Sequence, residues 1–386
     1  MTGTKESKLV NQVWVALGID PKTTPNHLTL GEIGMESMFA VELQQGLERE
    51  YDIKVTLNDI KNITIGMMKD FEVGKVDEMK CFAEEIKTCR TKLCKVKFII
   101  PTDAYQRLNN VTTGRPLYFL PPLEGIFASL EALAEKIERP VIGLNWLKDM
   151  EKLGSLKEIS KYYTNLMKIL EPQGDYDIFG HFYGALICMK MLKKAPVGRA
   201  VIIDMLSEIN LDEEMLSDDY LVEMIISFIG KDLPSVMKAK IRRDISTKPD
   251  VKSKLEKLTT ELKEFCGKSL VSRDLDEILM SSFKRAKLFT TYRLNMKTKF
   301  KKMKYNIAEK YMKMNGKILI IKPYEFGEDP NADEITDKIK NAYFLPEQGL
   351  EGKLNFETID ATGEEMEAQK TIEKMASSIN QYLSKK

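Results

Sequence analysis

From residue 116 onward, short apolar segments alternate with longer helical ones, and this alternation constrains the fold more than any other feature. The strand-like segments are PLYFL, PVIGL, YDIFG, AVIIDM, KILIIKP and LNFETID. Continuous apolar runs of this length are typical of parallel strands that are buried on both faces. Helical segments such as SLKEISKYYTNLMKIL separate most of them. The sequence therefore predicts an α/β domain with helices packed on a parallel sheet.

The alternation stops between Asp204 and Lys317, where no strand-like run occurs. Helical segments such as DDYLVEMIISFIG and RDLDEILMSSFKRAKLFTTYRL stand there instead. We expect this insertion, at about residues 210–310, to form a helical lid over the sheet.

The first part of the chain has a helical pattern. The segments SKLVNQVWVALGI and SMFAVELQQGLEREY each place apolar residues on one helical face. The segment TLNDIKNITIGMMKDF opens with Thr56 and Asp59 at capping-box spacing. We predict a four-helix mini-domain over residues 6–73. Residues 74–115 are charged and show no steady period, so we interpret them as a linker with a lead-in strand near KVKFIIP.

Composition excludes several classes of protein. Lys plus Arg is 59 and Asp plus Glu is 58, and the resulting net charge of +1 argues against a nucleic-acid binder. No apolar run reaches the ~18 residues of a membrane span, and the first residues lack the apolar core of a signal peptide. The five cysteines are odd in number and lack zinc-ligand spacing, so we expect reduced thiols, no metal and a cytoplasmic location.

Ser37 stands at a position suited to modification. In LGEIGMESMFAVELQQ it follows Glu36 and directly precedes an amphipathic helix. A phosphate ester on its hydroxyl would lie at a helix N-terminus, where free N–H groups and the helix dipole favour negative charge. The alternative is that Ser37 only caps the helix, which is a common role for serine.

The segment YDIFGHFYGALICMKM has the pattern of a nucleophile elbow, with an apolar strand, a tight turn between Gly180 and Gly184, and a helix. Phe182 occupies the middle of the turn, where the elbow normally presents a nucleophile, and a phenyl ring cannot attack a carbonyl. The chain has two histidines, His27 and His181, and none follows His181. A triad in the order Ser, Asp, His that begins at this elbow therefore cannot be completed by any choice of residues.

Two known domains resemble these segments. The stretch LTLGEIGMESMFAVELQQGLEREYDIKVTLNDI resembles the acyl carrier domain of animal (type I) fatty acid synthases. From Pro116 to the C-terminus, PLYFLPPLEGIF, RPVIGLNW and GKILIIK resemble in order the thioesterase that ends those synthases, a hydrolase of the oleoyl-[acyl-carrier-protein] type. The resemblance implies a four-helix carrier domain at 6–73, a linker at 74–115, and an α/β-hydrolase domain with a helical lid at 116–386.

The resemblance also implies the partners of the carrier part. Ser37 corresponds to the serine that holds a 4′-phosphopantetheine arm, with Glu36 in place of the family's usual aspartate. The implied partners are a phosphopantetheinyl transferase, an acyl chain, and synthase domains that act in trans or on a longer chain.

In the hydrolase part, the family's serine aligns with Phe182, its aspartate with Asp204 and its histidine with Gly363. Asp204 would be a remnant of the triad. The backbone N–H groups of Leu123 and Tyr183 correspond to the oxyanion hole, and backbone donors persist whatever the side chains are.

Other polar residues near the elbow do not supply the missing chemistry. We do not expect His181 to serve as the base, because it adjoins the nucleophile position. We interpret His27 as a loop residue. Tyr183 and Ser207 carry hydroxyls, but neither has an evident base. Phe182 is expected to pack as a buried aromatic side chain.

Three hypotheses follow. The first is a carrier fused to a thioesterase-like domain that has lost its activity and holds acyl chains or serves as structure. The second is an active acyl-[acyl-carrier-protein] thioesterase that releases a long-chain fatty acid with unconventional residues. The third is a small-molecule or acyl-binding module unconnected with fatty-acid synthesis. Phe182 and the missing histidine favour the first over the second, and the motif around Ser37 favours it over the third.

Overall fold

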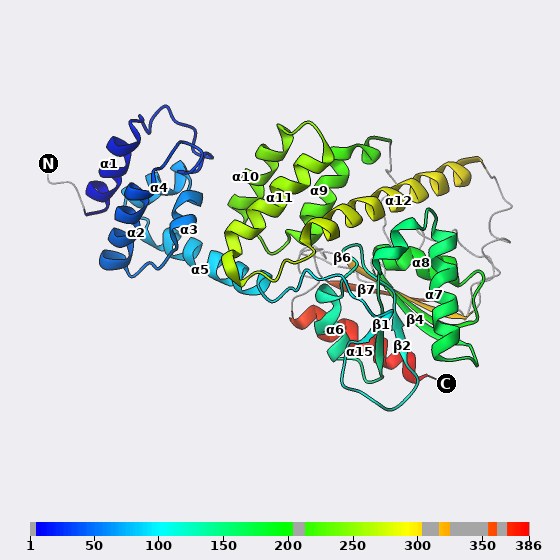
Figure 1. Cartoon of the computed structure of the whole chain (residues 1–386). Helices are drawn as coiled ribbons and strands as arrows, with labels where there is room; N and C mark the ends of the chain where they lie inside the picture. Colours follow the sequence, from blue (N-terminus) through cyan, green and yellow to red (C-terminus); the bar gives the residue numbers. More distant parts are fainter. Residues whose placement is uncertain (1–4, 204–212, 303–315, 325–353, 361–368, 386) are drawn as a thin grey trace. The chain divides into compact units, whose positions relative to one another are not determined.

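The computed structural model of the chain describes residues 5–203, 213–302, 316–324, 354–360 and 369–385 (Figure 1). Contacts between residues divide the chain into two compact units. The first unit combines the chain up to Lys97 with Ile229–Arg273, and the second combines Phe98–Phe228 with the chain from Asp274 onward. The division therefore assigns part of the predicted lid to the N-terminal unit.

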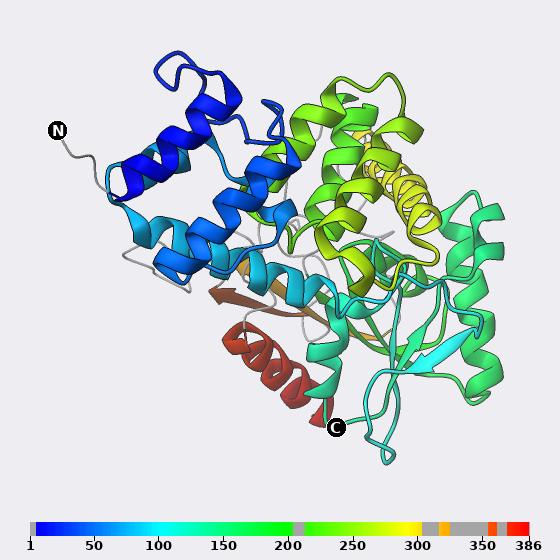
Figure 2. The same cartoon turned by 60° about the vertical axis from the view of Figure 1, so that its left-hand side comes forward.

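Four helices at the start of the chain form what we call the N-terminal helical domain, as predicted (Figure 2). They are α1 (Lys5–Leu17), α2 (Ser37–Tyr51), α3 (Leu57–Asn62) and α4 (Ile65–Glu72). The capping box at Thr56 and Asp59 is confirmed, because each side chain accepts a hydrogen bond from the other residue's backbone N–H. Thr64 caps α4 separately, so the segment from Thr56 onward forms two short helices. Trp14, Leu43 and other side chains of the apolar faces are buried.

The expectation of an irregular linker was wrong for much of residues 74–115. Helix α5 spans Val76–Leu93, and its buried residues Met79, Phe82, Ala83 and Ile86 recur with helical spacing. The charged residues between them obscured this stripe in the sequence. The lead-in strand near KVKFIIP does not form either. The first strand, β1, is the three-residue segment Tyr105–Arg107, whose side chains are all exposed.

The second unit contains a seven-stranded sheet in the order β1-β3-β2-β4-β5-β6-β7. All six predicted strands are present, and they pair in parallel, whereas β1 runs antiparallel to β3 at the edge. Their bounds are β2 (Leu117–Phe119), β3 (Val141–Leu144), β4 (Tyr176–His181), β5 (Val197–Ile203), β6 (Lys317–Tyr324) and β7 (Leu354–Asp360).

Helices cover both faces of this sheet. On one face, α6 (Glu131–Glu135) and α15 (Gln369–Ser384) pack on apolar side chains from β2 to β7, with Phe179, Val201 and Leu319 in that core. In both views α15, drawn in red, lies beside α6 (Figures 1 and 2). On the other face, α8 (Tyr183–Met191) packs on β4 and β5, and α7 (Leu156–Leu170) packs on α8. This three-layer order, with its antiparallel edge strand, is the α/β-hydrolase fold.

The insertion after β5 is helical, as predicted. It contains α9 (Asp218–Ile229), α10 (Ser235–Ser246), α11 (Val251–Cys266) and α12 (Leu275–Lys302).

Short 3-10 turns lie at Ala128–Leu130, Lys148–Lys152, Glu213–Leu216 and Gly267–Ser269. Among the described residues, no helix combines the length and apolar character needed to cross a bilayer.

Candidate functional site: an elbow that presents an aromatic ring

The turn between β4 and α8 has the geometry of a nucleophile elbow. Phe182 joins them with φ of 46° and ψ of −102°, a strained backbone conformation for a residue with a side chain. A Cβ atom on Gly180 would lie 2.4 Å from the carbonyl carbon of Gly184, so only glycine fits there. The predicted strand–turn–helix arrangement is therefore confirmed, although the residue at its apex is a phenylalanine.

The ring of Phe182 packs inside an aromatic cluster. It lies 4.6 Å from the ring of Phe289 in α12, nearly parallel to it, and 4.5 Å from the ring of Phe228 in α9. Only 6% of Phe182 is exposed. The expectation that Phe182 packs is confirmed, and the lid helices supply its neighbours.

The hydroxyl and thiol groups of α8, the helix that follows the elbow, are poor substitutes for a nucleophile or a base. Tyr183 is fully buried, and its hydroxyl has no hydrogen-bond partner among the described residues. Burial raises the pKa of Tyr183 well above its ordinary value, more than the nearby Arg285 lowers it. Cys188 in α8 is also buried, and burial raises the pKa of its thiol. Both groups remain protonated at neutral pH, so neither is activated.

Arg285 of α12 is the main feature of this site that sequence reasoning missed. Its side chain is fully buried and donates hydrogen bonds to the carbonyl oxygen of Leu123, at 2.6 Å, and to the hydroxyls of Ser281 and Ser282. The guanidinium carbon also lies 4.8 Å from the centre of the Trp146 ring. Burial lowers the pKa of Arg285 to about 10, so the group stays charged at neutral pH. The available signal was a pair of serines three and four residues before an arginine, a spacing that brings all three to one helical face.

The two predicted oxyanion positions flank the elbow. Tyr183 opens α8, and Leu123 lies in the loop after β2. This loop approaches the first turn of α8 closely, because a Cβ on Gly184 would lie 3.1 Å from the carbonyl oxygens of Leu120 and Pro121. Arg285 holds the Leu123 carbonyl from the lid side. The role of the two N–H groups as an oxyanion hole stays a prediction.

Of the remaining residues that the sequence singled out, only the two histidines lie within the described ranges. Asp204, Ser207 and Gly363 lie outside the described residues. His181 is the last residue of β4 and pairs with Ile203 of β5. His27 belongs to the other unit, in the loop before α2. Within the described ranges, no group of three or more His, Cys, Asp or Glu side chains could hold a metal ion.

Ser37 is exposed at the start of α2. Glu36, and not Ser37, is the N-cap residue, with an extended backbone and no capping side-chain bond in the described part of the chain. The alternative that Ser37 serves as the N-cap is therefore wrong. Gly34, with φ of 92°, makes the preceding turn. An exposed hydroxyl beside the free N–H groups of a fifteen-residue helix fits a phosphate ester on this oxygen.

Comparison with known proteins adds distant similarities. No protein-family model matches the chain. Over 182 residues, 46% of the chain, it is 22% identical to the polyketide synthase PksR of Bacillus subtilis (strain 168), and the match spans 7% of that synthase. All of the chain superposes on 26% of the four-domain nonribosomal peptide synthetase AB3403, with a TM-score of 0.52 and 16% identity. The NocB thioesterase domain gives a TM-score of 0.42 at 13% identity, over 71% of this chain and 96% of that domain.

Proposed function

We propose that the chain is a carrier protein that holds acyl chains on a 4′-phosphopantetheine arm at Ser37, fused to a thioesterase-like domain without hydrolase activity. The main supporting observation is the elbow, whose strained apex carries a buried phenylalanine. Similarity to a polyketide synthase and to a nonribosomal peptide synthetase supports a place in a synthase system of this general kind. Within that class we propose fatty acid synthesis in the cytoplasm, on the pattern of the animal synthases that the sequence resembles.

The N-terminal helical domain would provide the carrier function. Phosphopantetheine, when bound, supplies a thiol that holds an acyl chain as a thioester. The Ser37 oxygen would form the phosphate ester, and the first turn of α2 would favour its negative charge. A phosphopantetheinyl transferase would reach Ser37 without unfolding, because the residue is exposed.

The thioesterase-like domain would bind or shelter acyl groups, or serve as structure. Phe182 cannot attack, Tyr183 stays protonated, and no histidine follows His181 in the whole sequence. In triad hydrolases, loss of one member removes several powers of ten in rate, and loss of a second is no milder. We therefore expect no hydrolysis of thioesters above the uncatalysed rate.

Modification of Ser37 is tested by intact-mass measurement after incubation with a phosphopantetheinyl transferase and coenzyme A. We expect a gain of one phosphopantetheine mass in the native chain and none in Ser37→Ala. Thr23→Ala, an exposed change in the same domain, serves as the control and should be modified normally. An unchanged native mass would contradict the carrier function, and a gain that survives Ser37→Ala would contradict the site.

Hydrolysis is tested with long-chain acyl-CoA and acyl-pantetheine, using the native chain beside a Phe182→Ser, Gly363→His double variant. We expect no hydrolysis by the native chain. Activity gained in the double variant would show that the domain lacks only its chemistry. Hydrolysis by the native chain that is lost in Asp204→Ala would instead establish an unconventional thioesterase.

A further inference from the structure

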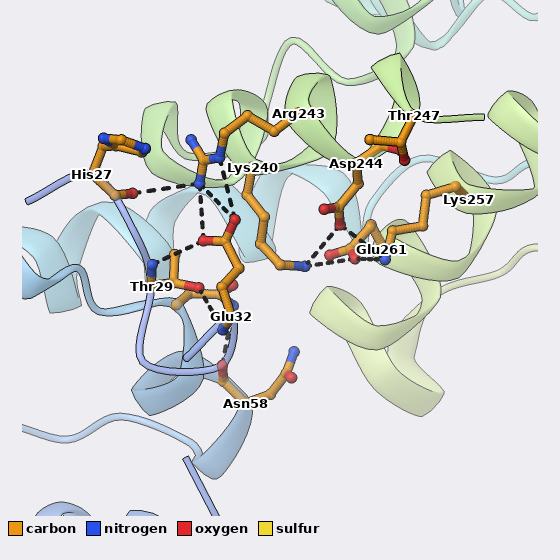
Figure 3. Close-up of polar contacts among 11 residues, drawn as sticks. His27, Thr29, Glu32, Asn58, Lys240, Arg243, Asp244, Thr247, Lys257 and Glu261 are labelled. Atoms are coloured by element: carbon orange, nitrogen blue, oxygen red, sulfur yellow. Dashed lines mark hydrogen bonds and ion pairs between the residues drawn. The ribbon is translucent and has the colours of Figure 1, made fainter. Parts of the chain in front are cut away.

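A charged contact joins the loop before α2 to helix α10, within the first unit. The Arg243 guanidinium donates to both carboxylate oxygens of Glu32, at 2.9 and 3.0 Å, and to the carbonyl oxygen of His27 at 3.4 Å (Figure 3). The Glu32 carboxylate also accepts the backbone N–H of Thr29 at 2.8 Å. Only 18% of the Glu32 side chain is exposed. A forked guanidinium–carboxylate pair is geometrically specific and fixes orientation as well as distance.

A second contact joins α3 and α5 to the end of α11. The Asn58 side chain donates to the carbonyl oxygen of Glu264 at 3.2 Å. Arg90 of α5 pairs with the buried carboxylate of Asp59 and donates to the carbonyl oxygen of Phe265 at 2.8 Å. The same guanidinium lies 4.8 Å from the centre of the Phe265 ring. Asp59, which completes the capping box of α3, is thereby linked to α11 through one arginine.

Helices α10 and α11 are themselves held together by charge. Glu261 of α11, whose side chain is nearly fully buried, pairs with Lys240 of α10 at 2.6 Å and with Lys257 at 2.7 Å. Lys257 also pairs with Asp244 of α10 at 3.0 Å (Figure 3). This network fixes α10 on α11, so that Arg243 and the end of α11 belong to one surface.

The chain segments that lead out of this unit also run together. Lys97, after α5, forms a parallel bridge with Val271, after α11. Three residues further on, the backbone N–H of Asp274 donates to the carbonyl oxygen of Phe98 at 3.0 Å, and its carboxylate accepts the N–H of Ile100 at 2.8 Å. The two segments therefore leave the N-terminal helical domain and the α10–α11 pair side by side.

We propose that the α10–α11 pair is a docking surface for the chain's own N-terminal helical domain, with Glu32–Arg243 as its specific contact. None of the contacts described between them involves Ser37, which is exposed together with Met38. Docking therefore leaves the modification site open to an external enzyme and keeps this half of the lid in one unit with the domain. The interpretation of the exposed Ser37 as a modification site rests on the proposed function, whereas the docking itself does not.

The test measures the cross-link between Lys61 of α3 and Lys263 of α11 in the full-length, unmodified chain. Lys61 follows Asn58 by one helical turn, and Lys263 adjoins Glu264, so both lysines lie within one helical turn of the Asn58 hydrogen bond. A short amine-reactive reagent is used, and the yield is normalised to the Lys61 peptide that has reacted at one end only. We expect Arg243→Glu to lower the yield about fivefold, because the change removes the forked pair and places two like charges at the contact.

Rescue separates docking from misfolding. We expect Glu32→Arg alone to lower the yield similarly, and the Glu32→Arg, Arg243→Glu exchange to restore at least half of it. Lys252→Glu, on an exposed part of α11, is the matched control and should leave the yield unchanged. An unchanged yield in Arg243→Glu, or an exchange variant no better than either single change, would overturn the proposal. Ser37→Ala should cross-link normally, so failure of the carrier function would not be mistaken for failure of docking.

Discussion

At the scale of single residues, the elbow combines a strained backbone with a side chain that serves packing. The conformation at Phe182 costs on the order of 1–3 kcal/mol and normally persists where it exposes a reactive atom. Here the same conformation directs a ring between Phe228 and Phe289. Arg285 also serves the local structure, because its buried guanidinium donates a hydrogen bond to the carbonyl oxygen of Leu123. The site is therefore ordered by aromatic and charged contacts with the lid.

Truncation of the ring should destabilise the second unit. We expect Phe182→Ala to lower the free energy of unfolding by about 3–5 kcal/mol, because a large buried side chain is replaced by a cavity. Denaturant unfolding followed by the fluorescence of Trp146 would measure the change. Tyr105→Ala, on an exposed edge strand, is the control and should cost far less. A loss below about 1 kcal/mol would mean that the aromatic cluster does not support the elbow.

At the scale of secondary-structure elements, the lid insertion is divided between the two units. Helices α9 and α12 supply the rings that cover Phe182, whereas α10 and α11 pack with the N-terminal helical domain. Helix α5 connects the helical domain to the rest of the chain and also contributes Arg90 to the contact with α11. The insertion therefore has two roles: it covers Phe182, and it packs with the N-terminal helical domain. Its helical sequence pattern does not show which helices have which role.

The contact between the loop before α2 and α10 should depend on pH. Burial would raise the pKa of Glu32, but hydrogen bonds from Thr29 and Arg243 outweigh burial and hold the pKa below its ordinary value. A carboxylate with a lowered pKa stabilises the fold above the unfolded value, about 4.3, and loses that contribution as pH falls through the folded value. At neutral pH we expect Glu32→Gln to be less stable than the native chain by about 1 kcal/mol.

This difference in stability should close as the pH is lowered through the folded pKa of Glu32, where the native carboxylate also becomes neutral. Denaturant unfolding followed by Trp14 fluorescence, at steps from neutral pH down through that pKa, would measure it. Glu48→Gln in α2, which is exposed, should show no such convergence. A gap that stays constant with pH would mean that the Glu32 charge does not contribute to the contact.

At the scale of the whole molecule, the chain consists of two compact units with one tryptophan in each. Trp14 lies in the first unit and Trp146 in the second, and both are buried. The chain passes between the units more than once. The segment Ile229–Arg273 belongs to the first unit, although the residues before and after it belong to the second. Each fluorophore therefore reports on the unit that contains it.

We expect the two units to unfold in separate transitions. In a Trp146→Phe background the signal follows the first unit, and in a Trp14→Phe background it follows the second. Phe182→Ala should shift only the Trp146 transition, and Asp59→Ala only the Trp14 transition. Coincident midpoints that both variants move together would show a single cooperative unit instead.

Much of the architecture could be predicted from short stretches of sequence. Apolar runs located the six parallel strands, the spacing of Thr56 and Asp59 located a helix start, and Gly180 and Gly184 located the elbow. Helix α5 was missed because charged residues separate its apolar positions, and β1 because its three exposed residues carry no apolar signal. The identity of Phe182 and the positions of the two histidines along the chain are enough to exclude a triad in the order Ser, Asp, His that begins at the elbow.

The sequence by itself determined the features that depend on neighbouring residues: periodicity, capping, glycine turns, and the identity of the residue at the apex of the elbow. The tertiary structure alone decided what surrounds them. Arg285 reaches a carbonyl 162 residues earlier, and Arg243 reaches a carboxylate 211 residues earlier. The partners of these two arginines leave no local pattern, because each partner lies far from its arginine along the chain. Only folding brings the aromatic rings of the lid onto Phe182 and the α10–α11 pair onto the N-terminal helical domain that contains Ser37.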